Sequence, residues 1–214
     1  MDGRGEHRLP ARPLWSKWSA ARCRCRASRR GLLSLAGRHR RRQTRPPFHV
    51  THVDAHADLG QGDAGLIYLL TELLFAPPEG RRDPPKRYGG LTDGNYLSFA
   101  VACRWLSGLV FVFSEGRLED IPPLAMEGFD ARASHIELAA VTEGEMFRHA
   151  GRMQHARVEH FEPRVPFALV PRADFHVEHA FDFVFLARSP NYTSTEADAV
   201  FDQIRSQFID ESAF

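Results

Sequence analysis

The chain has 214 residues, of which 43% are apolar and 26% are charged, a balance that is ordinary for a soluble globular protein with one sizeable core. No apolar run is long enough to cross a bilayer, so no membrane-spanning segment is expected. The three cysteines do not form a disulfide framework, which favours a reducing, cytoplasmic location.

The net charge of +1 conceals a division of the chain. Residues 1–45 carry 14 basic and two acidic residues, whereas residues 46–214 carry 14 basic and 25 acidic ones. Three interpretations of the first segment are open: a basic nucleic-acid arm, an organellar transit peptide, or a non-native start read partly out of frame. We favour the last and predict that residues 1–45 are disordered or non-native. Residues 46–214 are expected to form a single domain that binds neither nucleic acid nor membrane.

The most distinctive stretch covers residues 48–59, with the sequence FHVTHVDAHADL. It begins as an apolar, β-branched strand and ends in residue types that bind metals. In an extended chain alternate residues face the same side, so four such side chains would point one way: His52, Asp54, His56 and Asp58. Carboxylates with interleaved imidazoles favour manganese, zinc, iron or magnesium over a soft-thiolate metal. The alternative is a strand that ends in a polar loop, with these residues as caps.

Helices and strands are expected to alternate after this stretch. Asp63 predicts the N-cap of a helix that ends near residue 75. A loop rich in Pro and Gly covers residues 76–93, and a second helix should end near residue 106. Residues 109–113 (LVFVF) predict a buried strand.

The last third of the chain continues this alternation. Residues 134–141 predict a strand nearer an edge, and residues 165–170 an extended segment that Pro166 should keep out of the centre of a sheet. Residues 181–187 predict a second buried strand. Thr193 and Glu196 then form a capping box for a helix over about residues 194–209. This order indicates an α/β fold with a largely parallel sheet.

Three of the predicted strands end in polar residues, and parallel sheets place their sites beyond the carboxyl ends of strands. Asp54, His56 and Asp58 follow the first strand, Glu115 follows the second, and residues 189–192 follow the third. A metal held there could activate water, and a neighbouring carboxylate could transfer protons. We therefore predict Asp54, His56 and Asp58 as metal ligands, with Asp58 and Glu115 as catalytic groups.

The segment Asp54-Ala55-His56-Ala57-Asp58 resembles the Asp-Ala-His-x-Asp motif of the arginase/deacetylase (ureohydrolase) superfamily. The Asp-Gly-Asn segment at residues 93–95 and the Ser-Pro-x-Tyr-Thr segment at residues 189–193 are similar to an initially uncharacterised branch that includes peptide arginases. The likeness runs from about Phe48 to the C-terminus. It implies a three-layer α/β sandwich, a manganese centre of one or two ions, and hydrolysis of a guanidino or amide C–N bond. Peptide arginines would be converted to ornithine and urea.

The family pattern also requires a histidine ligand upstream and a later Asp-x-Asp. His7 is the upstream match, and no Asp-x-Asp follows residue 58. Asp182 is the best remaining carboxylate, with Asp174 or His176 behind it. The resemblance therefore implies His7 and Asp182 as further metal ligands.

The acidic excess of residues 46–214 favours a cationic small molecule or an arginine-containing peptide as the partner. Glu162 is one of several carboxylates that could bind a guanidinium group. Two alternatives are open. One is a degenerate, non-catalytic member of the fold that acts as a binding protein. The other is a different dinuclear amidohydrolase or phosphoesterase, suggested by His52-x-Asp54-x-His56.

Overall fold

The computed structural model describes residues 46–82, 90–114, 120–178, 181 and 195–208. The chain divides into two units, one over Arg45–His176 and one that combines Met1–Thr44 with Val177–Phe214. The predictions of a non-native or disordered segment at residues 1–45 and of a single domain over residues 46–214 stay predictions.

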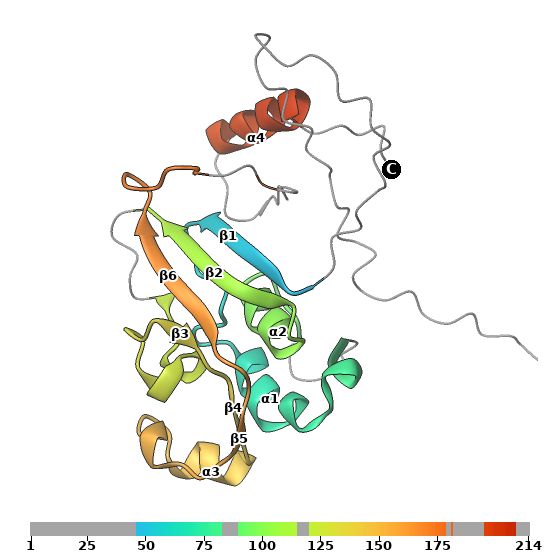
Figure 1. Cartoon of the computed structure of the whole chain (residues 1–214), viewed down its shortest axis with the longest axis vertical. Helices are drawn as coiled ribbons and strands as arrows, with labels where there is room; N and C mark the ends of the chain where they lie inside the picture. Colours follow the sequence, from blue (N-terminus) through green and yellow to red (C-terminus); the bar gives the residue numbers. More distant parts are fainter. Residues whose placement is uncertain (1–45, 83–89, 115–119, 179–180, 182–194, 209–214) are drawn as a thin grey trace, which may run out of the picture. The chain divides into compact units, whose positions relative to one another are not determined.

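The first unit is built on a four-stranded sheet with the order β1-β2-β6-β3 (Figure 1). Strand β2 is parallel to both β1 and β6, whereas the short β3 is antiparallel to β6. The predicted α/β class with a mostly parallel sheet is therefore confirmed. The strands are β1 (Phe48–Asp54), β2 (Leu106–Phe113), β6 (Val165–Pro171) and β3 (His135–Ile136).

Strand β6 has neighbours on both sides, so the prediction that Pro166 excludes the segment from the centre was wrong. Pro166 pairs with His135 of β3, before the ladder to β2 begins at Phe167. Pro171 occupies the other end of the same ladder, opposite Phe113. The prolines lie at the two ends of the strand, where a missing backbone N–H interrupts little of the parallel ladder.

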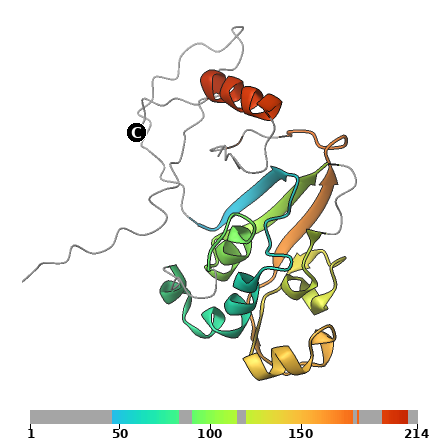
Figure 2. The same cartoon turned by 180° about the vertical axis from the view of Figure 1, so that it is seen from behind.

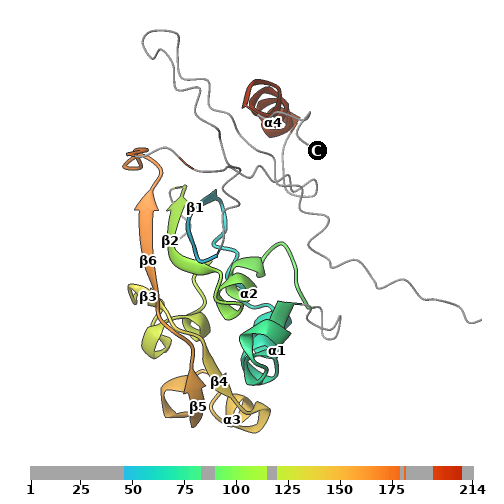
Figure 3. The same ribbon diagram turned by 45° about the vertical axis from the view of Figure 1, so that its right-hand side comes forward.

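Helices α1 (Ala64–Thr71) and α2 (Tyr96–Ala102) lie on the same side of this sheet (Figures 2 and 3). Asp63 caps α1 as expected, because its carboxylate accepts from the backbone N–H of Gly65. The predicted first helix is divided in two, since a 3₁₀ turn, η2 (Leu73–Phe75), follows α1. The finer expectation of a three-layer, arginase/deacetylase-like sandwich stays a prediction.

A second, two-stranded sheet pairs β4 (Ala139–Val141) with β5 (Val158–Phe161), antiparallel to each other. The strand predicted over residues 134–141 is thus two short strands, because the chain leaves β6 after Ile136 and then pairs with β5. Strand β5 was not predicted. Between β4 and β5 lie helix α3 (Glu143–Arg148) and a 3₁₀ turn, η7 (Met153–His155).

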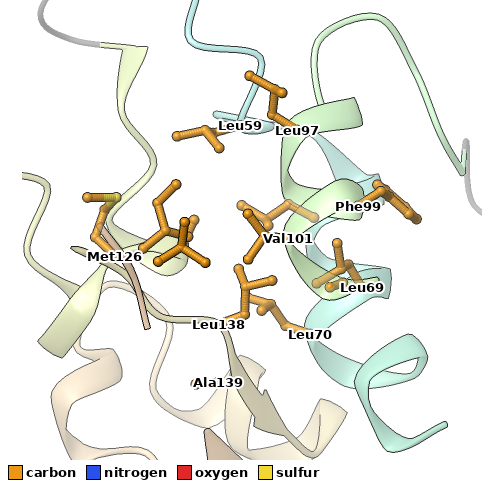
Figure 4. Close-up of a cluster of buried hydrophobic side chains, with 14 of the residues drawn as sticks. Leu59, Leu69, Leu70, Leu97, Phe99, Val101, Met126, Leu138 and Ala139 are labelled. Atoms are coloured by element: carbon orange, nitrogen blue, oxygen red, sulfur yellow. The ribbon is translucent and has the colours of Figure 1, made fainter. Parts of the chain in front are cut away.

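The hydrophobic core lies between the two helices and the segment that joins the two sheets (Figure 4). Complete burial of a leucine or phenylalanine stabilises the fold by roughly 1.5–3 kcal/mol per side chain. The core includes Ala57 and Leu59 from the loop that follows β1, whereas Asp54 at the carboxyl end of β1 is exposed. The labelled core residues are Leu59, Leu69, Leu70, Leu97, Phe99, Val101, Met126, Leu138 and Ala139.

Short 3₁₀ turns complete the first unit: η3 (Pro78–Arg82), η5 (Pro123–Ala125) and η6 (Glu127–Phe129). The second unit contributes one described helix, α4 (Thr195–Phe208), close to the predicted bounds. The predicted strand at residues 181–187 falls outside the described residues, apart from Phe181. No helix in the described part of the chain has the length and apolar character needed to cross a membrane.

Candidate metal centre

Strand β1 delivers His52 and Asp54 to the carboxyl end of the parallel sheet. Asp54 is the last residue of β1 and pairs with Phe113, the last residue of β2. The imidazole of His52 is 9% exposed, stacks on Phe111 at 5.6 Å between ring centroids, and meets the ring of Tyr96 edge-on at 6.1 Å. Two aromatic neighbours therefore fix the plane of this imidazole.

The chain turns after Asp54, so the extended arrangement predicted for residues 52–58 was wrong beyond that residue. Oδ1 of Asp54 accepts from the backbone N–H groups of Ala55 and His56. A carboxylate that bonds to the backbone two residues ahead makes an Asx turn, which ends a strand. Asp58 then adopts a left-handed conformation, with φ of 51°.

This turn brings three ligand groups together: His52, Asp54 and Asp58. One ligand atom from each lies within 4.8 Å of the other two. Nε2 of His52 is 3.3 Å from Oδ2 of Asp58. The group offers one imidazole nitrogen and two carboxylates, a donor set that suits borderline and hard divalent cations.

The hydrogen bonds of His52 define the roles of its two ring nitrogens. Nε2 lies 2.9 Å from the backbone carbonyl oxygen of His56, and because a carbonyl can only accept, Nε2 carries the proton. In the neutral ring Nδ1 is then an acceptor, and the hydroxyl of Tyr96 lies 3.3 Å from it. Tyr96 thus donates to His52.

Burial and local charge shift the acidity of two groups here. Burial raises the pKa of the Asp58 carboxyl above its usual value, and the charge of Asp54 adds to this effect, although His52 opposes it through its hydrogen bond and charge. Burial also raises the pKa of Tyr96, and the charges of Asp58 and Asp54 raise it further. The Tyr96 hydroxyl therefore keeps its proton at neutral pH and is able to donate.

The start of helix α2 holds the loop that carries Asp58. The N–H of Leu97 donates to the carbonyl oxygen of Asp58 at 3.2 Å, and the hydroxyl of Ser98 donates to that of Leu59 at 2.8 Å. The N–H of Gly60 donates to the carbonyl oxygen of Gly94 at 2.8 Å. The segment at residues 93–95 therefore lies directly beside the candidate site.

Asn95 ties this segment to helix α1. Its fully buried amide nitrogen donates to Oδ2 of Asp63 at 3.0 Å and to the carbonyl oxygen of Gly90 at 2.9 Å. A Cβ atom at Gly65 would come within 2.4 Å of this nitrogen, so the approach requires glycine. Asn95 thus fixes the segment at residues 93–95 against the start of α1.

The predicted site residues have different outcomes. Asp54 and Asp58 meet, and His52 joins them. His56 does not belong to this group; its side chain is exposed and its carbonyl oxygen accepts from His52. The other predicted residues, His7, Glu115 and Asp182, lie outside the described residues. Asp174 and His176 are exposed and do not join the group.

Two residues at the site were not predicted, Tyr96 and Asp120. Tyr96 follows the Asp-Gly-Asn segment directly, so its place at the start of a helix beside the motif was a usable signal. Oδ2 of Asp120 accepts from the backbone N–H of Ala57 at 2.7 Å. Nothing in the sequence links Asp120 to Ala57, because the two residues are 63 positions apart.

Comparison of the chain with protein-family models, with curated proteins and with solved structures found no match. A functional assignment therefore depends on the geometry of His52, Asp54 and Asp58 and on the short motif that contains two of them.

Proposed function

We propose that the protein is a metal-dependent hydrolase of the ureohydrolase type, which cleaves a guanidino or amide C–N bond. The single observation that carries this proposal is the convergence of His52, Asp54 and Asp58 at the carboxyl end of a parallel strand. This is where α/β sheets hold their sites. The expected reaction is conversion of an arginine side chain, in a peptide or a small molecule, to ornithine and urea.

The donor set fits Mn²⁺, the metal that the resemblance implies. His52, Asp54 and Asp58 would hold one ion, with His52 binding through Nε2 in place of its hydrogen bond to the carbonyl of His56. Its proton would then lie on Nδ1, directed at the oxygen of Tyr96, and such partners commonly orient metal-binding histidines. A second ion would need ligands such as Asp182 or His7.

The chemistry divides between the ion and the protein. A bound divalent ion supplies Lewis acidity and lowers the pKa of a water molecule. Asp58 and Glu115 are the carboxylates that we propose to take up and return protons. Tyr96 keeps the imidazole of His52 oriented through its hydroxyl.

The charge of the site supports a cationic substrate. Among the described residues, no lysine or arginine pairs with Asp54 or Asp58, whereas arginines neutralise carboxylates elsewhere in the unit. Unneutralised carboxylates attract a metal ion first, and a guanidinium group can be steered to the acidic surface around it. This favours a free or peptide-bound arginine over a neutral amide.

A second candidate, a metal-binding protein without catalysis, has one observation in its favour. The described residues supply one group of three ligands, and one of these, His52, already donates to a backbone carbonyl. A site of this size can hold an ion as a structural element. Assays of product and of metal content separate the two candidates.

The test uses the full chain, prepared in Mn²⁺ and supplied with an arginine-containing peptide. We expect bound manganese, urea release, and loss of both in Asp54→Asn and in His52→Phe, which preserves an aromatic ring on Phe111. His56→Ala should lose far less manganese, because His56 does not belong to the ligand group. Asp130→Asn, at an exposed carboxylate that pairs with Arg132, is the matched control. Wild-type protein without manganese would refute the proposal, and manganese without urea would favour the binding protein.

A further inference from the structure

The hydrogen bond between Ala57 and Asp120 lies at the centre of the loop that forms the candidate site. The backbone N–H of Ala57 donates to Oδ2 of Asp120 at 2.7 Å. Ala57 is fully buried and lies between His56 and Asp58. A buried backbone N–H needs a hydrogen-bond acceptor, and the carboxylate oxygen of Asp120 supplies it here.

The loop needs such a bond because its backbone is strained at Asp58. The left-handed conformation is disfavoured for residues other than glycine, although Asp and Asn adopt it more readily than the rest. Strained residues of this kind persist where surrounding contacts over-determine them. On one side of Ala57, Asp54 and His52 bond to the Ala55–His56 backbone; on the other, Leu97 holds the carbonyl of Asp58.

Asp120 holds the backbone at Ala57, which lies between these two sets of hydrogen bonds. Asp120 comes after strand β2 in the sequence and before η5, so its contact with Ala57 joins the loop after β1 to a segment beyond β2. Without it, the buried N–H of Ala57 would lose its hydrogen-bond partner, which is unfavourable. The loop could then relax the left-handed turn, and the Asp58 carboxylate would leave His52 and Asp54.

We propose that Asp120 is a positioning residue: it acts as a hydrogen-bond acceptor for Ala57, not as a ligand or a charge, and thereby holds Asp58 in the ligand group. The two possible roles of Asp120, hydrogen-bond acceptor and negative charge, predict different behaviour for its asparagine variant. Asparagine has the same shape and retains a carbonyl oxygen that can accept from Ala57, but it lacks the charge. Alanine removes both properties.

The experiment compares full-length wild type, Asp120→Asn and Asp120→Ala in two measurements. Amide hydrogen exchange of Ala57 and Asp58 in the metal-free protein reports on the loop. Titration with Mn²⁺ alone reports on the site, and this arm rests on the proposed function. We expect Asp120→Ala to expose both amides to faster exchange and to weaken Mn²⁺ binding about 10–100-fold, as loss of outer support does at other metal sites.

Asp120→Asn should retain the slow exchange of Ala57 and bind Mn²⁺ within a few-fold of wild type. If asparagine weakens binding as severely as Asp54→Asn does, Asp120 acts through its charge and the inference is overturned. The asparagine variant alone decides the question if the alanine variant does not fold. A wild-type chain that binds no Mn²⁺ refutes the proposed function, while the exchange of Ala57 still confirms or refutes the role of Asp120.

Discussion

Two carboxylate sites in the first unit differ in whether arginine side chains balance their negative charge. At the candidate metal centre, one ligand atom each of Asp54, Asp58 and His52 lies within 4.8 Å of the other two. About Glu162, which is 3% exposed, two arginines approach instead: Nη2 of Arg81 at 2.8 Å and Nε of Arg104 at 2.9 Å. One group gathers negative charge, and the other neutralises it.

The surroundings of Arg81 show that the second group is structural. Its guanidinium is 3% exposed and also donates to the carbonyl oxygens of Leu74, Ala76 and Ala102. The pair therefore joins the turns after α1 and the end of α2 to the residue that follows β5. Glu162 was predicted as a possible guanidinium-binding carboxylate. In this structure the guanidinium groups that it binds are those of Arg81 and Arg104 in the same chain.

The pKa values follow the same division. Burial and the charge of Asp54 raise the pKa of Asp58. Burial also opposes ionisation of Glu162, but hydrogen bonds and charge from Arg81 and Arg104 outweigh it and lower the pKa of that carboxyl. A carboxylate with a lowered pKa stabilises the fold at neutral pH, whereas one with a raised pKa opposes it and is available for a cation.

The largest expected effect is at the neutralised group. Glu162→Gln leaves the buried guanidinium of Arg81 without its counter-ion, and breaking a buried pair costs about 3–5 kcal/mol. We expect the free energy of unfolding to fall by that amount in urea titrations. Glu159→Gln, three residues earlier on β5 and in a loose, exposed pair with Arg157, should change it by less than about 1 kcal/mol. Equal effects of the two variants would mean that Glu162 is solvated in solution.

The next effect tests whether the unneutralised group binds a cation. Mn²⁺ at about 100 times its dissociation constant should add about 2.7 kcal/mol to the free energy of unfolding of the wild type. Asp58→Asn should remove this stabilisation, because one of the three ligands loses its charge. Glu162→Gln should retain it, even though the protein is less stable. Urea titrations with and without Mn²⁺ measure both, and a shift that survives in Asp58→Asn would contradict the site.

A smaller effect appears in the pH dependence of Glu162. Its folded pKa lies below the ordinary 4.5, so its contribution is complete above that value and is lost as the pH falls through the folded pKa. Below pH 4.5, wild type should therefore lose up to about 1.4 kcal/mol per pH unit through this group, and Glu162→Gln should not. The two proteins should converge in stability at low pH. A constant difference between them down to pH 3 would exclude ionisation of Glu162 as the cause.

The elements that could be predicted from this sequence are those defined by short-range patterns. Strand β1, strand β2 and the capped start of α1 were predictable, because apolar runs and an Asp before a helix act over a few residues. The central place of β6 was not, since it depends on where Pro166 falls in a ladder to a distant strand. Pairing partners far apart in the chain leave no local pattern.

At the candidate site, too, only the residues within a local motif could be predicted. The motif gave Asp54 and Asp58, but His52 replaces His56 in the group because the Asp54 side chain turns the backbone. A rule of alternation in an extended strand does not include such a turn. Asp120 reaches the site only through folding, and so do the arginines about Glu162.

The smallest effect gives the sharpest contrast between the two groups, because the same kind of substitution should act with opposite sign. In the metal-free protein, Asp58→Asn should raise the free energy of unfolding at pH 7, by up to about 1 kcal/mol. The raised pKa of Asp58 means that stability is lost as the pH rises through that pKa, and an uncharged side chain avoids the loss. Asparagine also tolerates the left-handed conformation at φ of 51° and can still accept from Nε2 of His52. Urea titration in a chelator measures the change, with Asp174→Asn, at an exposed carboxylate, as the control. If Asp58→Asn destabilises the metal-free protein, the Asp58 carboxylate is compensated within the fold as Glu162 is, and its availability to a cation is refuted.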